Sequence, residues 1–142
     1  MIVPETSLLI YAVNRGASFH QRANSWLNSA LVGDESVGFV WSTLTEFVRL
    51  TTRSSLPAPL TVEEAFEIVN RWITARNARI IHPGPRHREL LQKLITAVGI
   101  GSNMVSNAHL AAIAIEHGAE VCSNDSQFNQ FPGLRWRNPL AD

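Results

Sequence analysis

Short apolar runs alternate with longer segments of helical periodicity along the whole chain. The apolar runs predict strands at residues 1–3, 36–41, 79–81, 120–123 and 135–136. Between them, apolar residues spaced by three and four predict helices at residues 6–13, 19–31, 42–52 and 86–98, one beginning near residue 61 and one ending at residue 117.

The alternation of strands and helices indicates an α/β fold. The predicted strands are short and mainly apolar rather than evenly alternating, which is typical of a parallel sheet covered by helices on both faces. In such sheets, ligands bind outside the carboxyl ends of the strands. The polar residues that follow the strands are therefore the first candidates for function.

Two local signals mark the ends of predicted helices. Thr61 stands three residues before Glu64, and this spacing predicts a capping box at a helix start. Gly118 follows the helix that ends at His117, where a glycine suits the position after the C-cap.

Length, charge and cysteine content exclude several classes of protein. A chain of 142 residues suits one compact domain. Twelve basic residues balance twelve acidic ones, so a binder that relies on high overall charge is not expected. The apolar run at residues 8–13 is too short to span a bilayer, and no basic segment precedes it as in a signal peptide. The single cysteine, Cys122, excludes a disulfide framework and is expected to be inert, so we expect a soluble, cytoplasmic protein with no membrane contact.

Four polar side chains lie near the ends of the predicted strands. Glu5 follows the first strand, and Glu46 lies one turn into the helix after the second. Asn107 stands near the start of the helix before the fourth strand, and Asp125 follows that strand. Three carboxylates and one amide that converge at one sheet edge would suit a hard cation such as Mg²⁺ or Mn²⁺.

An ordinary structural role is open to three of these residues. Glu46 follows Thr43 by three residues and could complete a capping box, and Asp125 could cap the following turn. Asn107 could be a polar residue near a helix start. Glu5 is harder to explain in this way, because a buried carboxylate between two apolar runs needs a partner.

Four ordered blocks of the sequence resemble a known family. They are VPETSLLIYAVN, WSTLTEFVRL, NMVSNAHLAAIAIEHGAEVCSNDSQF and FPGLRWRNPL. Together they resemble the PIN-domain toxins of bacterial VapBC toxin–antitoxin pairs, which are metal-dependent ribonucleases. The resemblance implies a three-layer α/β/α PIN-like domain with a short, mainly parallel central sheet, formed as a single domain by residues 1–142.

The resemblance also implies a site for Mg²⁺ or Mn²⁺ at the four positions already singled out: Glu5, Glu46, Asn107 and Asp125. Supporting positions that match the family pattern are Thr6, Ser7 and Ser123. Arg49 follows Glu46 by three residues and shares its helical face, where it could orient Glu46, contact RNA phosphate or form a surface ion pair. His109 is expected to point elsewhere on its helix and to be structural.

Two positions depart from the family pattern, which usually has Asp where this chain has Glu5 and Asn107. Glutamate is longer by one methylene and would displace the ion, and asparagine lacks the negative charge. Mg²⁺ demands near-ideal octahedral geometry, so both changes should weaken its binding. We expect a ribonuclease toxin with impaired activity. The alternative is a catalytically weak or inactive PIN-fold module that binds antitoxin or RNA.

The resemblance further implies three partners: a cognate VapB-type antitoxin, an RNA substrate and a second copy in a homodimer. The tryptophan-bearing segments 19–31 and 42–52 are candidate contact surfaces. A receiver-like signalling domain would share the length and the acidic pocket. It would need a lysine at the end of a late strand, whereas the only lysine, Lys93, is predicted in mid-helix.

Overall fold

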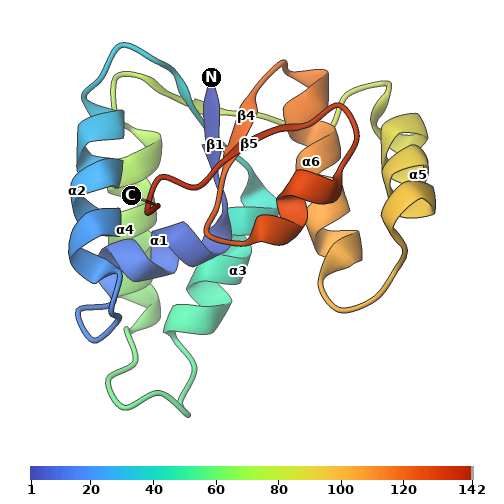
Figure 1. The fold of residues 1–142 in the computed structure, drawn as a ribbon. Coiled ribbons are helices and arrows are strands. Elements are labelled where there is room, and N and C mark those ends of the chain that lie inside the picture. The colour runs from blue at the N-terminus through green and yellow to red at the C-terminus, as the bar shows by residue number, and fades with distance from the viewer. Residues whose placement is uncertain (142) are drawn as a thin grey trace.

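The central sheet has five parallel strands in the spatial order β3-β2-β1-β4-β5. The computed structural model describes residues 1–141. Its strands are β1 (Ile2–Pro4), β2 (Val37–Phe39), β3 (Ala78–Ile80), β4 (Glu120–Cys122) and β5 (Arg135–Arg137) (Figure 1). The predicted α/β class is confirmed, and β1 occupies the middle of the sheet.

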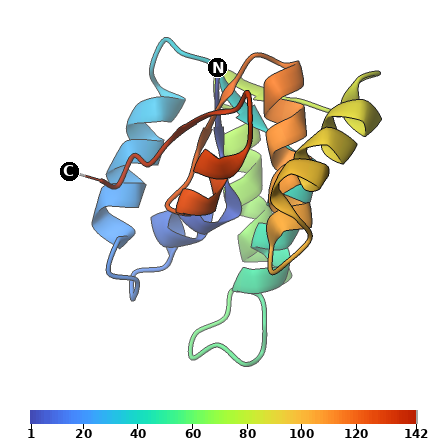
Figure 2. The ribbon, with the colours of Figure 1, turned by 45° about the vertical axis from the view of Figure 1, so that its right-hand side comes forward.

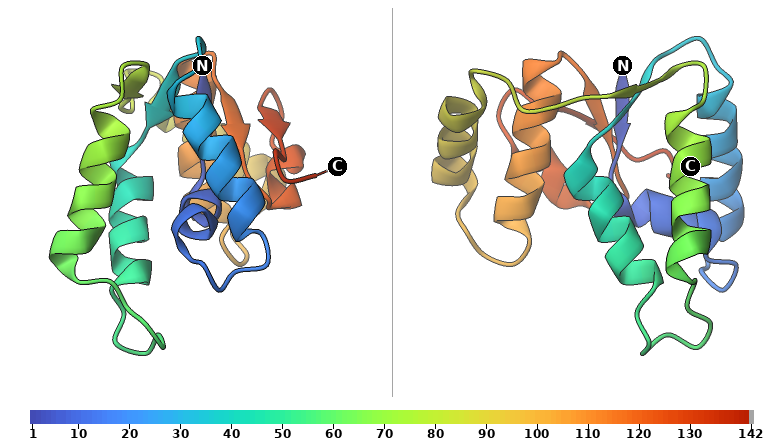
Figure 3. Two further views of the ribbon diagram at one scale, coloured as in Figure 1. Left: turned by 90° about the vertical axis from the view of Figure 1, so that its left-hand side faces the viewer. Right: turned by 180° about the vertical axis from the view of Figure 1, so that it is seen from behind.

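Six α-helices surround the sheet in the described part of the chain. They are α1 (Thr6–Val13), α2 (His20–Leu31), α3 (Trp41–Thr51), α4 (Val62–Ile73), α5 (His87–Val98) and α6 (Met104–Glu116), and a short 3-10 helix, η1, spans Ser126–Gln130. Figure 3 shows α1 to α4 on one side of β1 and α5 and α6 on the other. Within residues 1–141, no helix is long and apolar enough to cross a membrane.

Two apolar clusters lie on opposite faces of the sheet. Ile2 packs into the cluster that holds Phe47 of α3, whereas its neighbour Val3 packs into the cluster that holds Ile113 of α6. Successive side chains of a strand point to opposite faces, so β1 is buried on both. Burial on both faces explains why this strand is continuously apolar.

Both predicted helix-end signals are confirmed. The Glu64 backbone N–H donates to Thr61 Oγ1 at 3.1 Å, and the Thr61 N–H donates to Glu64 Oε1 at 2.9 Å, which completes the capping box of α4. Gly118 follows the C-cap residue His117 and has a φ of +63°, in the left-handed region that favours glycine.

The predicted strand at residues 36–41 is too long, because α3 already begins at Trp41. The suggested capping box of Thr43 with Glu46 is wrong for the same reason. Val40 is the N-cap residue of α3, Thr43 is buried in the third helical position, and no side chain caps this helix. The other predicted boundaries differ from the observed ones by at most one residue.

Cys122 on β4 is fully buried. Burial raises the pKa of its thiol to about 11, because the thiolate would lose its hydration. The thiol therefore stays protonated near neutral pH, in agreement with the predicted inert role.

The helix α5 lies at the edge of the molecule and packs on α6 (Figure 2). The turn that leads into α5 is tied to the end of α6 by Glu116. The two oxygens of this carboxylate accept hydrogen bonds from the Gly84 N–H at 2.8 Å and from the Arg86 N–H at 2.9 Å. A Cβ atom at position 84 would collide with the Glu116 carboxylate, so any other residue there would force this side chain to move.

Thr61→Ala should lower the free energy of unfolding by about 1 kcal/mol, because the N–H of Glu64 loses its acceptor. Chemical denaturation followed by circular dichroism would measure the change. Thr96→Ala is the matched control, because Thr96 is an exposed residue inside α5 where alanine is the better helix former. An equal loss in both variants would contradict the role of the cap.

Candidate active site

Two of the predicted site residues lie at the carboxyl ends of neighbouring strands. Glu5 directly follows β1 and is the N-cap residue of α1, and its N–H donates to the Cys122 carbonyl of β4 at 2.9 Å. Ser123 follows β4 and is fully buried, and Asp125 comes two residues later. The parallel pairing of β1 and β4 therefore brings these three side chains to one edge of the sheet.

The Ser123 hydroxyl connects Glu5 with the Asp125 loop. Ser123 Oγ donates to Glu5 Oε2 at 2.9 Å and accepts a hydrogen bond from the Asp125 backbone N–H at 2.9 Å. Ser7 Oγ donates to the other Glu5 oxygen, Oε1, at 3.3 Å. Both oxygens of the Glu5 carboxylate are thus held by hydroxyl donors.

Asp125 has two hydrogen-bond partners of its own. Its Oδ1 accepts from the Gln127 N–H at 2.9 Å, which caps η1 as the structural alternative predicted. Its Oδ2 accepts from Asn107 Nδ2 at 3.2 Å. The capping role and a place in the polar site are therefore compatible in one residue.

Asn107 is a buried residue in the fourth position of α6. Its amide nitrogen faces Asp125, and within residues 1–141 its carbonyl oxygen has no hydrogen-bond donor. The carbonyl oxygen is left free to accept a hydrogen bond or to ligate a cation.

Glu46 lies on α3 and forms an ion pair with Arg49, whose guanidinium contacts Glu46 Oε1. The carboxylate side chain is 41% exposed and the guanidinium side chain is 64% exposed. The predicted contact between these residues is confirmed. An ion pair this exposed contributes little to stability, which leaves both groups available to a ligand.

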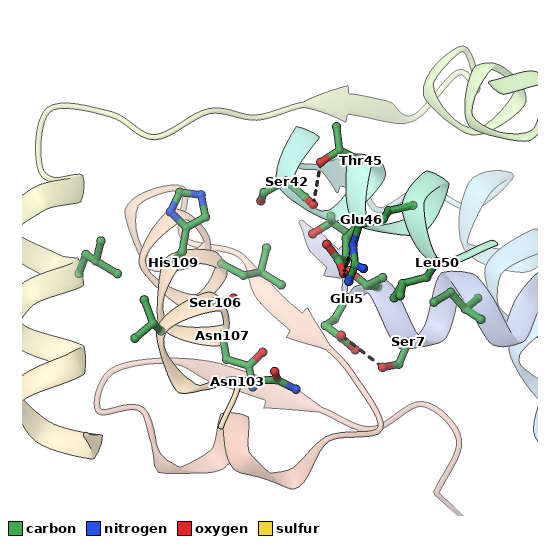
Figure 4. A pocket seen from close by; sticks show the side chains of 17 residues that line it. Glu5, Ser7, Ser42, Thr45, Glu46, Leu50, Asn103, Ser106, Asn107 and His109 are labelled. Carbon is green, nitrogen blue, oxygen red and sulfur yellow. Dashed lines mark hydrogen bonds and ion pairs between the residues drawn. The ribbon is translucent and has the colours of Figure 1, made fainter. Parts of the chain in front are cut away.

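A cleft of about 820 Å³ joins these elements. Glu5, Thr6, Ser7, Glu46, Arg49 and Asn107 all line it, together with apolar side chains of α1, α3, α5 and α6. Figure 4 shows the labelled residues of α6 across the cleft from Glu46 of α3. Ser123 and Asp125 are not part of the lining but contact Glu5 and Asn107, which are.

The pKa of Glu5 is raised above its ordinary value, chiefly because burial disfavours the charged carboxylate. The hydrogen bonds from Ser7 and Ser123 oppose this effect, and the nearby Asp125 carboxylate adds to it. The site thus favours a compensating positive charge.

The donor chemistry fits a hard divalent cation. Glu5 and Asp125 provide carboxylate oxygens, Asn107 provides an amide oxygen, and Glu46 lines the same cleft. Nevertheless, no three His, Cys, Asp or Glu side chains between residues 1 and 141 are grouped as a metal site would need. The asparagine at position 107 is one reason for the absence of such a group, because it stands where the resemblance implies an acid.

The expectation that His109 points away from the site is wrong, because His109 lines the cleft. Its Nδ1 lies 3.0 Å from Nε2 of His87, the first residue of α5. Burial and the neighbouring His87 lower the pKa of His109. The sequence does contain a signal for this placement, since His109 follows Ser106 by three residues and shares its helical face.

The comparison with known proteins agrees with this geometry. The family model described as "PIN domain" matches residues 2–134 of this chain. The chain belongs to the PIN domain family. It is 43% identical over 142 residues to Ribonuclease VapC37 of Mycobacterium tuberculosis, with 99% of each chain covered, and 34% identical over 143 residues to Ribonuclease VapC33 of the same species, with both chains covered completely.

Solved structures of other PIN proteins share the fold at low sequence identity. VapBC2 from Rickettsia felis, bound to a DNA fragment from its promoter, aligns with a TM-score of 0.72 at 18% identity and covers 97% of this chain and 98% of its own. VapC20 from Mycobacterium tuberculosis, described as a Sarcin-Ricin loop cleaving toxin, aligns with a TM-score of 0.69 at 18% identity and covers 95% of this chain and 99% of its own. The three-layer PIN-like fold is thereby confirmed.

Glu5→Gln should stabilise the metal-free protein at neutral pH. A raised folded-state pKa means that stability is fully present below the unfolded pKa and is lost as pH rises through the folded pKa. The variant should therefore melt at a higher temperature than the parent at pH 7 in EDTA. Near pH 3, about one unit below the ordinary glutamate pKa, this difference should disappear.

Glu67→Gln on the exposed face of α4 is the control for this measurement and should melt like the parent at both pH values. A Glu5→Gln protein that is less stable than the parent at pH 7 would show that the charged carboxylate stabilises the fold.

Proposed function

We propose that the protein is a metal-dependent ribonuclease that hydrolyses RNA phosphodiester bonds, and that it is the toxin of a type II toxin–antitoxin pair. The observation that carries this proposal is the full-length similarity to Ribonuclease VapC37 at 43% identity. The polar network of Glu5, Ser123, Asp125 and Asn107 beside an open cleft supports it. The same proposal places the protein in the cytoplasm, where its RNA substrate is present.

The residues that would hold Mg²⁺ or Mn²⁺ are Glu5, Asn107, Asp125 and Glu46. When bound, such an ion lowers the pKa of water and offsets negative charge on a phosphate. Hydrogen bonds within the chain orient two of these proposed metal ligands. Ser7 and Ser123 orient Glu5, and the Gln127 N–H and the Asn107 amide orient Asp125.

Arg49 has two uses in this proposal. In the structure it pairs with Glu46, which reduces the repulsion between this carboxylate and an incoming RNA strand. If Glu46 held a cation, the exposed guanidinium of Arg49 would be free to bind an RNA phosphate, for which its forked donors are well suited. Thr6 lines the cleft beside Glu5 and supplies a further hydroxyl group.

A second candidate function is a PIN-fold module that binds antitoxin or RNA with little catalysis. Asn107 favours it, because an amide that donates to Asp125 satisfies this carboxylate without a cation. The expected partners are the same in both cases: a cognate VapB-type antitoxin and a second copy of this chain. On α3, Trp41 is 42% exposed and available for such a contact.

Asn107→Asp should bind Mn²⁺ more tightly than the parent, on the order of tenfold, because a fourth carboxylate replaces the amide. In EDTA the same variant should melt at a lower temperature, since a carboxylate replaces the donor to Asp125 Oδ2. Isothermal titration and thermal melting measure the two effects.

Asn103→Asp is the matched control for this charge change. It adds a carboxylate to the same wall of the cleft, at the N-cap of α6, on an exposed residue. If Asn107→Asp and Asn103→Asp raise the affinity equally, position 107 is not a metal ligand.

The double variant Glu5→Asp with Asn107→Asp should cleave RNA faster than the parent. A displacement of about 1 Å at the reacting atoms costs on the order of a hundredfold in rate. The double variant removes the extra methylene at position 5 and restores the missing negative charge at position 107. Cleavage of a fluorescent RNA in Mn²⁺ measures the gain, and Asp125→Ala should abolish the remaining activity. A parent as fast as the double variant, with Asp125→Ala unaffected, would contradict the assigned site.

A further inference from the structure

The proposed metal site does not use His109, although this residue lines the same cleft. The ring of His109 meets the ring of His87 edge to face, with centroids 4.7 Å apart and planes at 84°. His109 Nδ1 and His87 Nε2 are 3.0 Å apart, which is a hydrogen bond. In a neutral pair, one of these two nitrogens carries the hydrogen and the other accepts it.

The surroundings of His87 Nδ1 decide whether the hydrogen of this bond belongs to His87 or to His109. His87 Nδ1 is buried and has no hydrogen-bond partner in the described part of the chain. If His87 accepted from His109, its own hydrogen would lie on Nδ1 as a buried, unpaired N–H donor. If His87 instead donates from Nε2, Nδ1 is a bare acceptor, and unpaired buried acceptors are tolerated better than unpaired buried N–H groups.

The tautomer of His87 determines the tautomer of His109, which lines the cleft. Because His109 Nδ1 accepts from His87, the hydrogen of the neutral His109 ring lies on Nε2. Within residues 1–141, Nε2 has no partner and is not among the buried unpaired atoms. His109 therefore offers an uncharged N–H donor to whatever occupies the cleft.

We propose that His109 is a positioning residue that donates from Nε2 to a phosphate oxygen of RNA bound in the cleft. The proposal rests on the ribonuclease function proposed above. Asn103 at the N-cap of α6 and Ser106 in its first turn line the same wall and provide an amide and a hydroxyl donor (Figure 4). Among the described residues of α5 and α6, none that lines the cleft is acidic, so this wall suits an anionic phosphate.

The tautomer is tested without RNA by nitrogen-15 NMR at pH 8, above the ordinary histidine pKa. Long-range nitrogen–proton correlations should place the hydrogen on Nε2 in both His87 and His109. A hydrogen on Nδ1 of His109 would overturn the proposal, whatever the protein does with RNA. This measurement uses the unaltered chain, so it does not depend on the folding of any variant.

The phosphate contact is tested by fluorescence anisotropy with short labelled RNAs in EDTA, where no cleavage occurs. His109→Ala should weaken binding about tenfold, the usual effect of a lost hydrogen bond to a charged acceptor. His109→Gln should bind nearly as well as the parent, because the glutamine amide nitrogen can replace Nε2 as a donor. His87→Leu should weaken binding, and His87→Gln, which keeps a donor to His109 Nδ1, should restore it.

A comparison of RNAs with different bases distinguishes a phosphate contact from base recognition. The loss in His109→Ala should be equal for oligouridine, oligoadenosine and oligocytidine, and a loss confined to one of them would overturn the phosphate assignment. Equal affinities of His109→Ala and the parent would overturn the role of His109 alone. A parent that binds none of these RNAs would overturn the proposed function, and thermal melts of each variant confirm that the compared proteins are folded.

Discussion

The hydrogen bond from Ser123 to Glu5 joins residues 118 positions apart in the sequence, and the polar site depends on it. It exists because β1 and β4 pair in parallel and end at the same edge. The buried hydroxyl has one hydrogen to donate and gives it to the carboxylate, while its oxygen fixes the Asp125 loop. Removing this hydroxyl would leave Glu5 Oε2 and the Asp125 N–H without their partners at once.

The carboxylate acceptors of the site are balanced by hydrogen-bond donors of the protein itself, although the negative charges of Glu5 and Asp125 are not neutralised. Two serine hydroxyls face Glu5, an amide and a backbone N–H face Asp125, and a guanidinium faces Glu46. An acid at position 107 would break this balance and create a demand for a cation. The asparagine therefore lets the fold satisfy its polar groups with or without metal, which is consistent with weak metal binding and with the second candidate function.

The sequence predicts most of the fold because the central strands are buried on both faces and the helices carry strong local signals, such as Thr61 with Glu64. The β2–α3 junction is predicted less well. Trp41 continues the apolar run of SVGFVW, so its place as the first residue of a helix is set by tertiary packing. Among the site residues, Glu5, Asn107, Ser123 and Asp125 are brought together as expected.

The role of His109 is missed because the pairing of α5 with α6 is not visible in local periodicity. The ring of His87 comes from 22 residues earlier, and only the packed helices show that the two rings meet. A similar limit applies to Arg49. Its spacing from Glu46 predicts the ion pair, but not whether the pair persists once a ligand enters the cleft.

The attachment of α5 has a consequence for local unfolding. This helix packs on α6, and the turn before it is held by two hydrogen bonds to Glu116, whereas the central strands β1, β2 and β4 are buried between the two apolar clusters. The backbone amides of α5 should therefore exchange with solvent through an opening that leaves the sheet intact. Such an opening would remove Leu91 from one wall of the cleft while Glu5 and Asp125 stay in place. The width of the cleft and the geometry of its acidic end are thus governed by separate cooperative units of one small fold.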